Sequence, residues 1–309
     1  MTASRAAAQA APAQAPAATP SSSGVRLSGY IQARETYRDG VGLTGSINRA
    51  RLTAYGSAVS GVTWRIQGEF RTGSVGTGKA SVSLQDAYIR YQSGEFGLQA
   101  GQFKTPFTRE FITSLADVET ADRSTVVDSV APKRDIGLMA DYAIGPTAAV
   151  MLGVFNGEGQ NVTTNSDSTL LWAGRASVRP VAYLTLGANA AAYHTDSTRY
   201  GVDAGLEYRG ATLKAEYIGQ HRDGGTVDDK GWYAQGTYKV HPWVQLVLKQ
   251  EDFRRSEISE ALRNRATTGG VNVELGGGKV RLLANYVSRK IGMPGVRRST
   301  LITQAQVKF

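Results

Sequence analysis

Apolar and polar side chains alternate along most of the chain after residue 24. In the first such segment, residues 25–37, Leu27 and Ile31 fall on one side of an extended chain, and Gln32 and Arg34 fall on the other. Strict alternation is typical of a β-strand with one apolar and one polar face. Because the same rhythm returns as far as Phe309, the sequence predicts an all-β chain of about sixteen strands.

The expected connections between these strands are of two kinds, which alternate along the chain. Short turns on one rim and long loops on the other are typical of outer-membrane barrels. We therefore predict a transmembrane antiparallel β-barrel over residues 25–309, with an even strand number that places both termini on the short-turn, periplasmic side. The short turns are expected near Ser60, Ser93, Gly145, Pro180, Gly210, Pro242 and Gly277, and the longer loops near Gly40 and Gly76 and within 105–133, 157–165, 223–229, 257–265 and 292–295.

A soluble β-sandwich would show the same alternation, so the residue types on each face must separate the two folds. The apolar faces are rich in Ala and Gly, which suits contact with lipid better than a packed core. Aromatic residues such as Tyr37, Phe70 and Trp243 fall near strand ends, as in the interfacial girdles of membrane barrels. No apolar run reaches the length of a transmembrane helix, and a barrel is the other way to span a bilayer.

Residues 104–133 interrupt the alternation. A connection of this length is uncommon in a strand-rich chain and is usually functional when ordered. We predict that it folds into the barrel as a constriction loop, with apolar residues such as Phe107 and Val127 anchoring it to the wall; an extracellular lid is the alternative. The basic residues expected to belong to this constriction are Lys104, Arg109, Arg123, Lys133 and Arg134.

The N-terminal segment, residues 1–24, is rich in Ala, Pro, Gln and Ser and has one charge, Arg5. This composition predicts a disordered segment. It lacks the apolar core of a complete signal peptide, so for an exported protein the signal is expected upstream of Met1 or already removed.

The composition excludes several kinds of chemistry. The chain has no cysteine and three histidines, His194, His221 and His241, without the spacing of metal ligands. We therefore expect no metal site, no cofactor and no catalytic residue. An outer-membrane lipid hydrolase would need a serine beside a histidine on the lipid-facing wall, and no such pair is evident. A structural or adhesive barrel that binds a partner through its loops is a further alternative.

The net charge of +9 would suit binding to nucleic acid or an anionic surface in a soluble protein, and it would attract anions inside a pore. Within a barrel, the polar face of each strand lines the lumen, so we predict an anion path and no nucleic-acid partner. Some of these arginines would instead pair with the luminal acids Glu69 and Asp86. Charge reversal at Arg49 and Arg51 is predicted to abolish anion preference. The arginines expected along the path are Arg34, Arg49, Arg51, Arg65, Arg71, Arg90 and Arg175.

Several stretches between about residues 45 and 145 resemble the phosphate-selective porin O and P family of outer-membrane channels. The first is Ile47-Asn48-Arg49-Ala50-Arg51-Leu52, and the second is Val82-Ser83-Leu84-Gln85-Asp86-Ala87-Tyr88. The longest is Gly101-Gln102-Phe103-Lys104-Thr105-Pro106-Phe107, which continues to Arg123-Ser124 and to Ala131-Pro132-Lys133-Arg134-Asp135-Ile136-Gly137. The C-terminal half is similar to the family in strand rhythm, and the terminal Phe309 resembles the aromatic residue recognised during barrel assembly.

The resemblance implies a sixteen-stranded outer-membrane barrel that forms a homotrimer and passes small anions, such as phosphate or similar oxyanions, along luminal arginines and lysines. Its expected partners are outer-membrane lipids, lipopolysaccharide and the anions themselves. The chain departs from the family at Asn48, where an arginine is common before Arg49. A barrel without anion selectivity is the alternative function.

Overall fold

The computed structural model describes residues 24–71, 80–193, 197–222, 227–256, 263–292 and 295–309. The predicted N-terminal segment and His194 therefore lie outside the described residues, apart from Gly24. The first eight strands are β1 (Arg26–Arg38), β2 (Gly42–Val59), β3 (Val62–Arg71), β4 (Ser81–Ser93), β5 (Phe96–Lys104), β6 (Arg134–Ile144), β7 (Ala148–Phe155) and β8 (Leu171–Val181). The other eight are β9 (Leu184–Tyr193), β10 (Ser197–Tyr208), β11 (Ala211–Arg222), β12 (Val227–His241), β13 (Val244–Arg254), β14 (Asn264–Leu275), β15 (Val280–Ile291) and β16 (Val296–Lys308).

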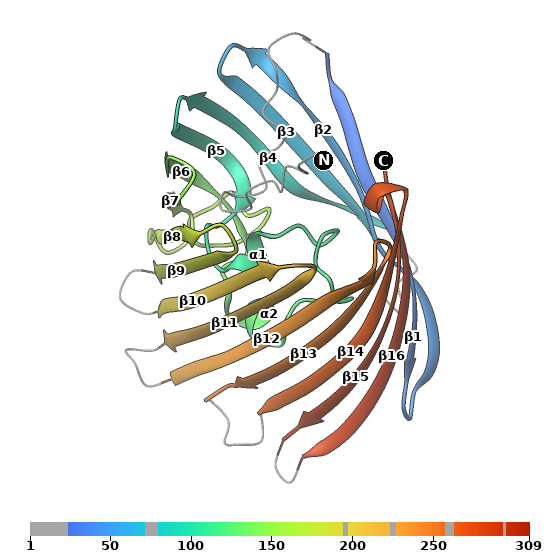
Figure 1. Ribbon diagram of the computed structural model, residues 1–309. Helices are drawn as coiled ribbons and strands as arrows, with labels where there is room; N and C mark the ends of the chain where they lie inside the picture. Colours follow the sequence, from blue (N-terminus) through green and yellow to red (C-terminus); the bar gives the residue numbers. More distant parts are fainter. Residues whose placement is uncertain (1–23, 72–79, 194–196, 223–226, 257–262, 293–294) are drawn as a thin grey trace.

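The sixteen strands form one closed antiparallel barrel, which confirms the predicted fold class (Figure 1). Each strand pairs with its neighbours in sequence, and β1 pairs with β16 from Tyr30 opposite Lys308 to Arg38 opposite Thr300. Closure leaves no strand edge unpaired, so every backbone ladder is satisfied within the chain. No helix in the described segments is long and apolar enough to cross a membrane.

The alternation seen in the sequence separates the two faces of the wall. Side chains such as Ile31, Ile66, Ile89 and Leu248 are about half exposed on the outer face. Their strand neighbours are polar and buried on the inner face, as Gln32 is beside Ile31. The two faces therefore differ in chemistry, with an apolar outer face and a largely polar inner face, as in a transmembrane barrel.

The short and long connections alternate as predicted, with one difference. A short turn joins each even-numbered strand to the next, for example through Gly61 and Gly210, both of which have a positive φ. The connection near Gly40, expected to be one of the longer loops, has only three residues, 39–41. It is short because β2 extends through 18 residues and its pairing with β1 continues to Arg38 opposite Gly42.

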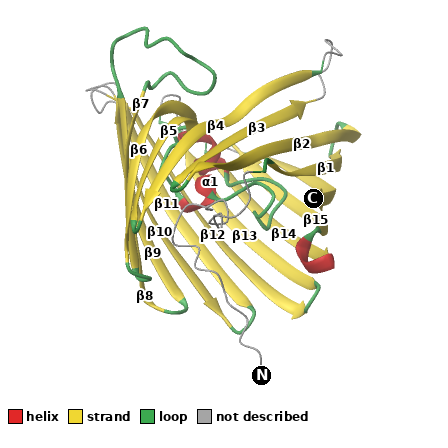
Figure 2. Cartoon of the chain, turned by 90° about the horizontal axis from the view of Figure 1, so that it is seen from above, coloured by secondary structure: helices red, strands yellow, loops and turns green. Residues whose placement is uncertain are grey.

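The long connection between β5 and β6 lies inside the ring of strands (Figures 1 and 2). It contains two short helices, α1 (Arg109–Ile112) and α2 (Thr125–Val130). Helix α2 packs against β11, β12 and β13, on the far side of the barrel from the strands that carry Arg34 and Arg49. We call residues 105–133 the inner loop; Lys104, expected as its first residue, is the last residue of β5.

Candidate anion-conducting lumen

Three residues of the motif Gly101–Phe107, at the end of β5 and the start of the inner loop, have a structural role. Gly101 has a φ of +127°, and a Cβ there would lie 2.2 Å from the Ala87 carbonyl oxygen, so only glycine fits. The Gln102 side chain donates hydrogen bonds to the carbonyl oxygens of Leu84 (3.0 Å) and Gln85 (3.1 Å) on β4. Thr105 Oγ1 donates to the Pro132 carbonyl at 2.9 Å, which ties the two ends of the loop together.

Apolar side chains hold the inner loop against one part of the inner wall. Phe107, Phe111, Val126, Val127 and Val130 of the loop are almost fully buried in one cluster. Their contact surface consists of apolar residues at inward-facing strand positions, where a water-filled barrel normally carries polar residues. These wall residues are Met139, Met151, Phe155, Leu171, Ala173, Ala191, Ile218, Tyr233 and Phe253.

Polar groups of β11 and β13 fasten the helices of the loop. The Glu216 carboxylate accepts hydrogen bonds from the backbone N–H groups of Arg109 (3.1 Å) and Glu110 (2.6 Å) and from the Tyr233 hydroxyl (2.7 Å). Lys249 Nζ lies 3.2 Å from Glu110 Oε1, and both side chains are buried. Since buried charges are expensive unless paired, these contacts fix the helices in place.

The middle of the loop is fastened to the other side of the wall. Asn285 accepts a hydrogen bond from the backbone N–H of Ala121 (2.7 Å), and Asn272 donates to the Glu119 carbonyl (2.8 Å). Arg281 and Gln306 both donate to the carbonyl oxygen of Ala116, at 3.3 and 3.0 Å. The loop therefore spans the lumen: its apolar cluster includes wall residues of β6 to β9, and its polar contacts run from β10 round to β1.

Most of the arginines predicted to line the lumen are bound to a carboxylate. Arg51 of β2 pairs with Glu69 of β3, directly opposite in the strand register. Asp86 of β4 holds both Arg65 (3.3 Å) and Arg134 (2.8 Å). The remaining pairs are Arg90 with Asp141 (2.5 Å), Arg175 with Asp203 (2.5 Å), and Arg109 of the loop with Asp203 (2.8 Å). The side chain of Arg71 lies outside the described residues.

Three basic side chains between the inner loop and strands β2 and β5 lack a carboxylate hydrogen bond within the described part of the chain: Arg49, Lys104 and Arg123. Lys104 Nζ donates to the carbonyl oxygens of Phe111 (2.7 Å), Ile112 (3.1 Å) and Thr113 (2.8 Å). Arg123 donates to those of Glu110, Phe111 and Thr113, each at 3.0 Å. None of these hydrogen-bond partners is a carboxylate, and we call the three residues the unpaired cation cluster.

The members of the unpaired cation cluster act on one another electrostatically. Arg123 lies within electrostatic range of the carboxylates Asp128 and Glu110 and of the cations Arg134 and Arg49, and Lys104 lies within range of Arg123. Burial lowers the pKa of the Arg123 guanidinium to about 10, so Arg123 remains protonated at neutral pH. The cluster therefore groups basic side chains between the inner loop and strands β2 and β5, with carboxylates of the loop nearby.

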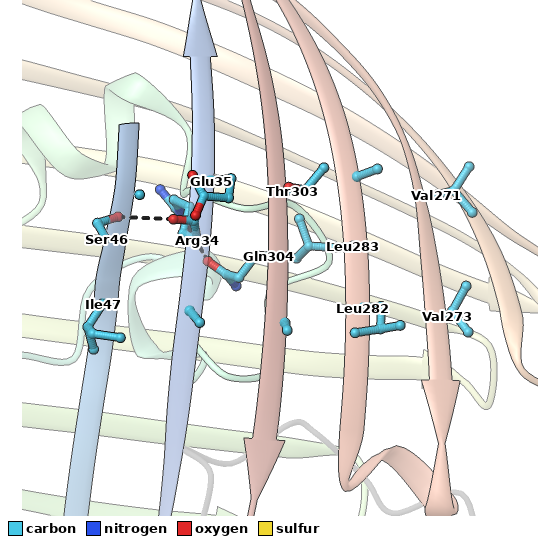
Figure 3. A pocket seen from close by; sticks show the side chains of 14 residues that line it. Arg34, Glu35, Ser46, Ile47, Val271, Val273, Leu282, Leu283, Thr303 and Gln304 are labelled. Atoms are coloured by element: carbon cyan, nitrogen blue, oxygen red, sulfur yellow. Dashed lines mark hydrogen bonds between the residues drawn. The ribbon is translucent and has the colours of Figure 1, made fainter. Parts of the chain in front are cut away.

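Arg34 and Arg49 share a polar neighbour, Asn48. Asn48 is the extra residue of β2 at the register shift between β1 and β2, and its side-chain amide lies 3.2 Å from Gln32 and 3.0 Å from Gln304. With its oxygen turned toward the two arginines, it accepts from Arg34 (2.8 Å) and Arg49 (2.6 Å). Figure 3 shows Arg34 bonded to Gln304 of the neighbouring strand β16. An arginine at Asn48 would add a third cation here, so the asparagine lowers charge repulsion.

Arg34 of β1 and Lys133 of the inner loop each have a hydrogen-bond partner in the inner loop. Arg34 also donates to Asp122 of the inner loop, at 3.0 and 3.1 Å from its two carboxylate oxygens. Lys133 is exposed and donates to the Asp128 carbonyl oxygen. The two predicted luminal acids, Glu69 and Asp86, lie buried on the inner wall as partners of Arg51, Arg65 and Arg134.

The residues that fasten the inner loop to the wall were not identified from the sequence. Glu216, Lys249, Asn272 and Asn285 all occupy inward positions of their strands, so their alternation phase marks them as luminal. Their partners, however, are more than 100 residues away in the chain. Five of the apolar wall residues lie on β6 to β8, and a sequence signal marks them, because these strands have apolar side chains on both faces.

A closed sixteen-strand barrel with a charged interior and a loop folded into its lumen defines the class of outer-membrane porins. The chain belongs to the phosphate-selective porin O and P family, whose sequence profile matches residues 29–211. It is accordingly a bacterial outer-membrane channel and not an enzyme. Among the described residues, no group of His, Asp and Glu side chains is arranged to hold a metal ion.

Solved structures show the same fold at low sequence identity. The outer membrane channel DcaP of Acinetobacter baumannii is 14% identical, with a TM-score of 0.69 over 92% of this chain and 97% of that chain. An anion-selective porin from Comamonas acidovorans is 13% identical, with a TM-score of 0.67 over 93% and 99%. The trimer form of Vibrio cholerae OmpT is 11% identical, with a TM-score of 0.67 over 93% and 99%. A comparison with curated protein sequences gave no significant match.

Proposed function

We propose that this porin passes small anions, phosphate or similar oxyanions, through a lumen whose selectivity comes from the unpaired cation cluster. The observation that supports this proposal is that Arg49, Lys104 and Arg123 bond to amide and carbonyl oxygens and not to a carboxylate. In a partly desolvated lumen an ion at close range to such a charge gains about 4 kcal/mol, against about 1 kcal/mol in water. Several separated cations attract an anion while still allowing it to leave.

Arg49 is the residue best suited to test this proposal. Arg51, expected to act with it, is bound to Glu69, so reversing its charge would place two carboxylates together and disturb the wall. Arg49→Glu is expected to lower the chloride-to-potassium permeability ratio roughly tenfold, since one close charge of the cluster is inverted. The measurement is the reversal potential in planar bilayers under a salt gradient.

Lys279→Glu is the matched control for Arg49→Glu. Lys279 is exposed in the turn between β14 and β15, away from the inner loop, and its reversal makes the same change in net charge. A reversal potential that Arg49→Glu leaves at the wild-type value, or that both variants change equally, would contradict the proposed role of Arg49. Conductance in chloride with added phosphate, pyrophosphate or dicarboxylate then identifies the preferred anion.

A channel without anion preference is the second candidate. The observation in its favour is the number of luminal arginines held by carboxylates, among them Arg51, Arg90 and Arg175. Each such pair contributes little net field to a passing ion. A wild-type reversal potential near zero in the same salt gradient would support this candidate.

We also propose that the chain forms a homotrimer and that both termini face the periplasm. The trimer is supported by the family and by the trimeric form of a structural neighbour. The orientation is supported by the rims, because the termini and the short turns lie at the same end, as in outer-membrane barrels. Chemical cross-linking of the detergent-extracted protein tests the trimer.

The orientation can be tested by labelling, because the chain has no cysteine of its own. Thr164→Cys lies exposed in the β7–β8 connection on the long-loop rim, and Ala182→Cys lies exposed in the β8–β9 turn. An impermeant maleimide is expected to label Thr164→Cys on intact cells and Ala182→Cys only after the outer membrane is permeabilised. The reverse pattern would show that the barrel is inserted with its long loops inward.

A further inference from the structure

The outer wall carries a row of positive charges that conduction does not use. Arg265 of β14, Lys290 of β15 and Arg297 of β16 are direct cross-strand neighbours, Arg265 opposite Lys290 and Lys290 opposite Arg297. All three are exposed. They share the alternation phase of Tyr286 and Leu301, which are exposed on the outer face. We call these three residues the outer basic row.

The outer basic row lies at the level where a membrane surface is expected. Tyr286 and Tyr37, both about half exposed, lie in one row with Leu301, which is opposite each of them in the strand register. Tyrosine and tryptophan rings on an outer barrel wall mark the boundary between acyl chains and headgroups. The outer basic row lies four residues beyond this level on each of β15 and β16, toward the long-loop rim.

The protein itself only partly balances the charge of the row. Asp252 of β13 lies opposite Arg265 and pairs with it at 3.2 Å, but it also holds Arg263 at 2.6 Å. Lys290 and Arg297 have no hydrogen bond or ion pair in the described segments. Like charges directly opposite each other on neighbouring strands are destabilising, so the row gains from an anion bound across it.

On β7 to β10 the outward positions near the long-loop rim are apolar or aromatic: Val154, Trp172, Ala192 and Tyr200. Beside the outer basic row, Lys230 of β12 lies opposite Arg254 of β13, and both are exposed on the outer face. The positive charge is therefore a feature of one sector, β12 to β16. Such a sector would bind one kind of headgroup at one place on the barrel.

We propose that the outer basic row binds the phosphate groups of a phosphorylated lipid in the outer leaflet, with lipid A phosphate as the matching chemistry. The guanidinium groups of Arg265 and Arg297 present planar donor pairs that fit phosphate oxygens, and Lys290 adds a point charge between them. Each basic residue near an anionic membrane surface attracts it. The acyl chains of the lipid would lie along the outer wall below the row. The inference rests on the proposed orientation, which places the long-loop rim in the outer leaflet.

The test uses the full chain refolded in detergent and two lipids, bisphosphorylated lipid A and its dephosphorylated form. Native mass spectrometry measures the bound fraction of each lipid. The wild-type barrel is expected to retain the phosphorylated form at least tenfold more strongly, because the second form offers the same acyl chains without phosphate. This comparison needs no substitution, so it does not depend on the folding of a variant.

The double variant Lys290→Gln with Arg297→Gln is expected to bind the phosphorylated lipid roughly tenfold or more weakly, since two surface charges are lost. The matched control is Arg298→Gln with Lys279→Gln. It loses the same charge, but Arg298 lies on the opposite face of β16 and Lys279 at the short-turn rim. The control is expected to bind as the wild type does.

Three results would overturn the proposal: equal binding of both lipids, an equal loss in the control, or full displacement of the lipid by millimolar inorganic phosphate. The last would mean that the row binds a free anion. The double variant is also expected to keep the wild-type reversal potential, because the row lies outside the lumen. Failure of the lipid test with normal anion preference would therefore reject this inference alone, and the maleimide test reports separately on the orientation.

Discussion

Replacing Arg51 with alanine is expected to destabilise the folded barrel by about 3–5 kcal/mol, the cost of leaving a buried charge without its partner. The Glu69 side chain is 1% exposed and pairs with Arg51 directly across the β2–β3 ladder. Arg51 also donates to Gln85 of β4, at 3.3 Å, so its loss disturbs three neighbouring strands. The free energy of unfolding can be followed in urea by tryptophan fluorescence of the protein folded into lipid vesicles.

The double variant Arg51→Ala with Glu69→Ala distinguishes the stabilisation that comes from the ion pair from that which comes from the packing of the two side chains. Removing both charges leaves no carboxylate stranded in the wall, so the double variant is expected to be more stable than Arg51→Ala alone. Two results would contradict this role of the pair. The first is an equal free energy of unfolding for the two variants, and the second is a loss of less than about 1 kcal/mol for Arg51→Ala, as for exposed pairs. Either result would mean that Glu69 is solvated and that the ion pair does not stabilise the barrel.

Placing an aspartate at Val127 is expected to release the inner loop and raise the single-channel conductance severalfold. Val127 is fully buried in the apolar cluster that joins α2 to the wall. A carboxylate there has no partner, and burying an isolated charge is strongly unfavourable. The loop would leave the wall, and a barrel of this strand number has an aqueous channel once it is not obstructed. The conductance is measured in planar bilayers at fixed salt.

The control for this substitution is Ser129→Asp, two residues further along the same helix. Ser129 is exposed, so the same new charge enters the lumen without entering the apolar cluster. It is expected to leave the conductance within the spread of the wild type, with a small change in anion preference. Equal conductance of Val127→Asp and the wild type would show that polar contacts, such as those of Glu216 and Lys249, hold the loop without the cluster.

These two expected results concern different halves of the same interior. On strands β2 to β6 the charged residues pair along and across the wall, and the unpaired cation cluster faces what remains of the lumen. On strands β10 to β16 polar wall groups bind the inner loop, and apolar wall residues from β6 onward pack with it in one cluster.

Much of the architecture could be read from the order of residues. Strand number, the faces of the wall, the short turns and the membrane class all depend on the alternation of side chains and on local turn chemistry, which are properties of neighbours in the sequence. The position of residues 105–133 inside the barrel could also be anticipated, because a long ordered insertion with Phe107 and Val127 needs a surface to cover them. The length of β2, and with it the short connection at 39–41, could not, since strand ends depend on pairing across the sheet.

The alternation of neighbouring residues shows which side chains face the lumen, whereas the pairing of distant strands sets which of those side chains meet a carboxylate. Arg49 and Arg51 are two residues apart on the same face of the same strand, and nothing in their local sequence distinguishes them. Strand pairing distinguishes them. Arg51 lies opposite the carboxylate of Glu69 on β3, whereas Arg49 lies opposite the uncharged Gln32 on β1. A Coulomb interaction depends on the distance between atoms, and closing the barrel sets those distances between residues far apart in the chain.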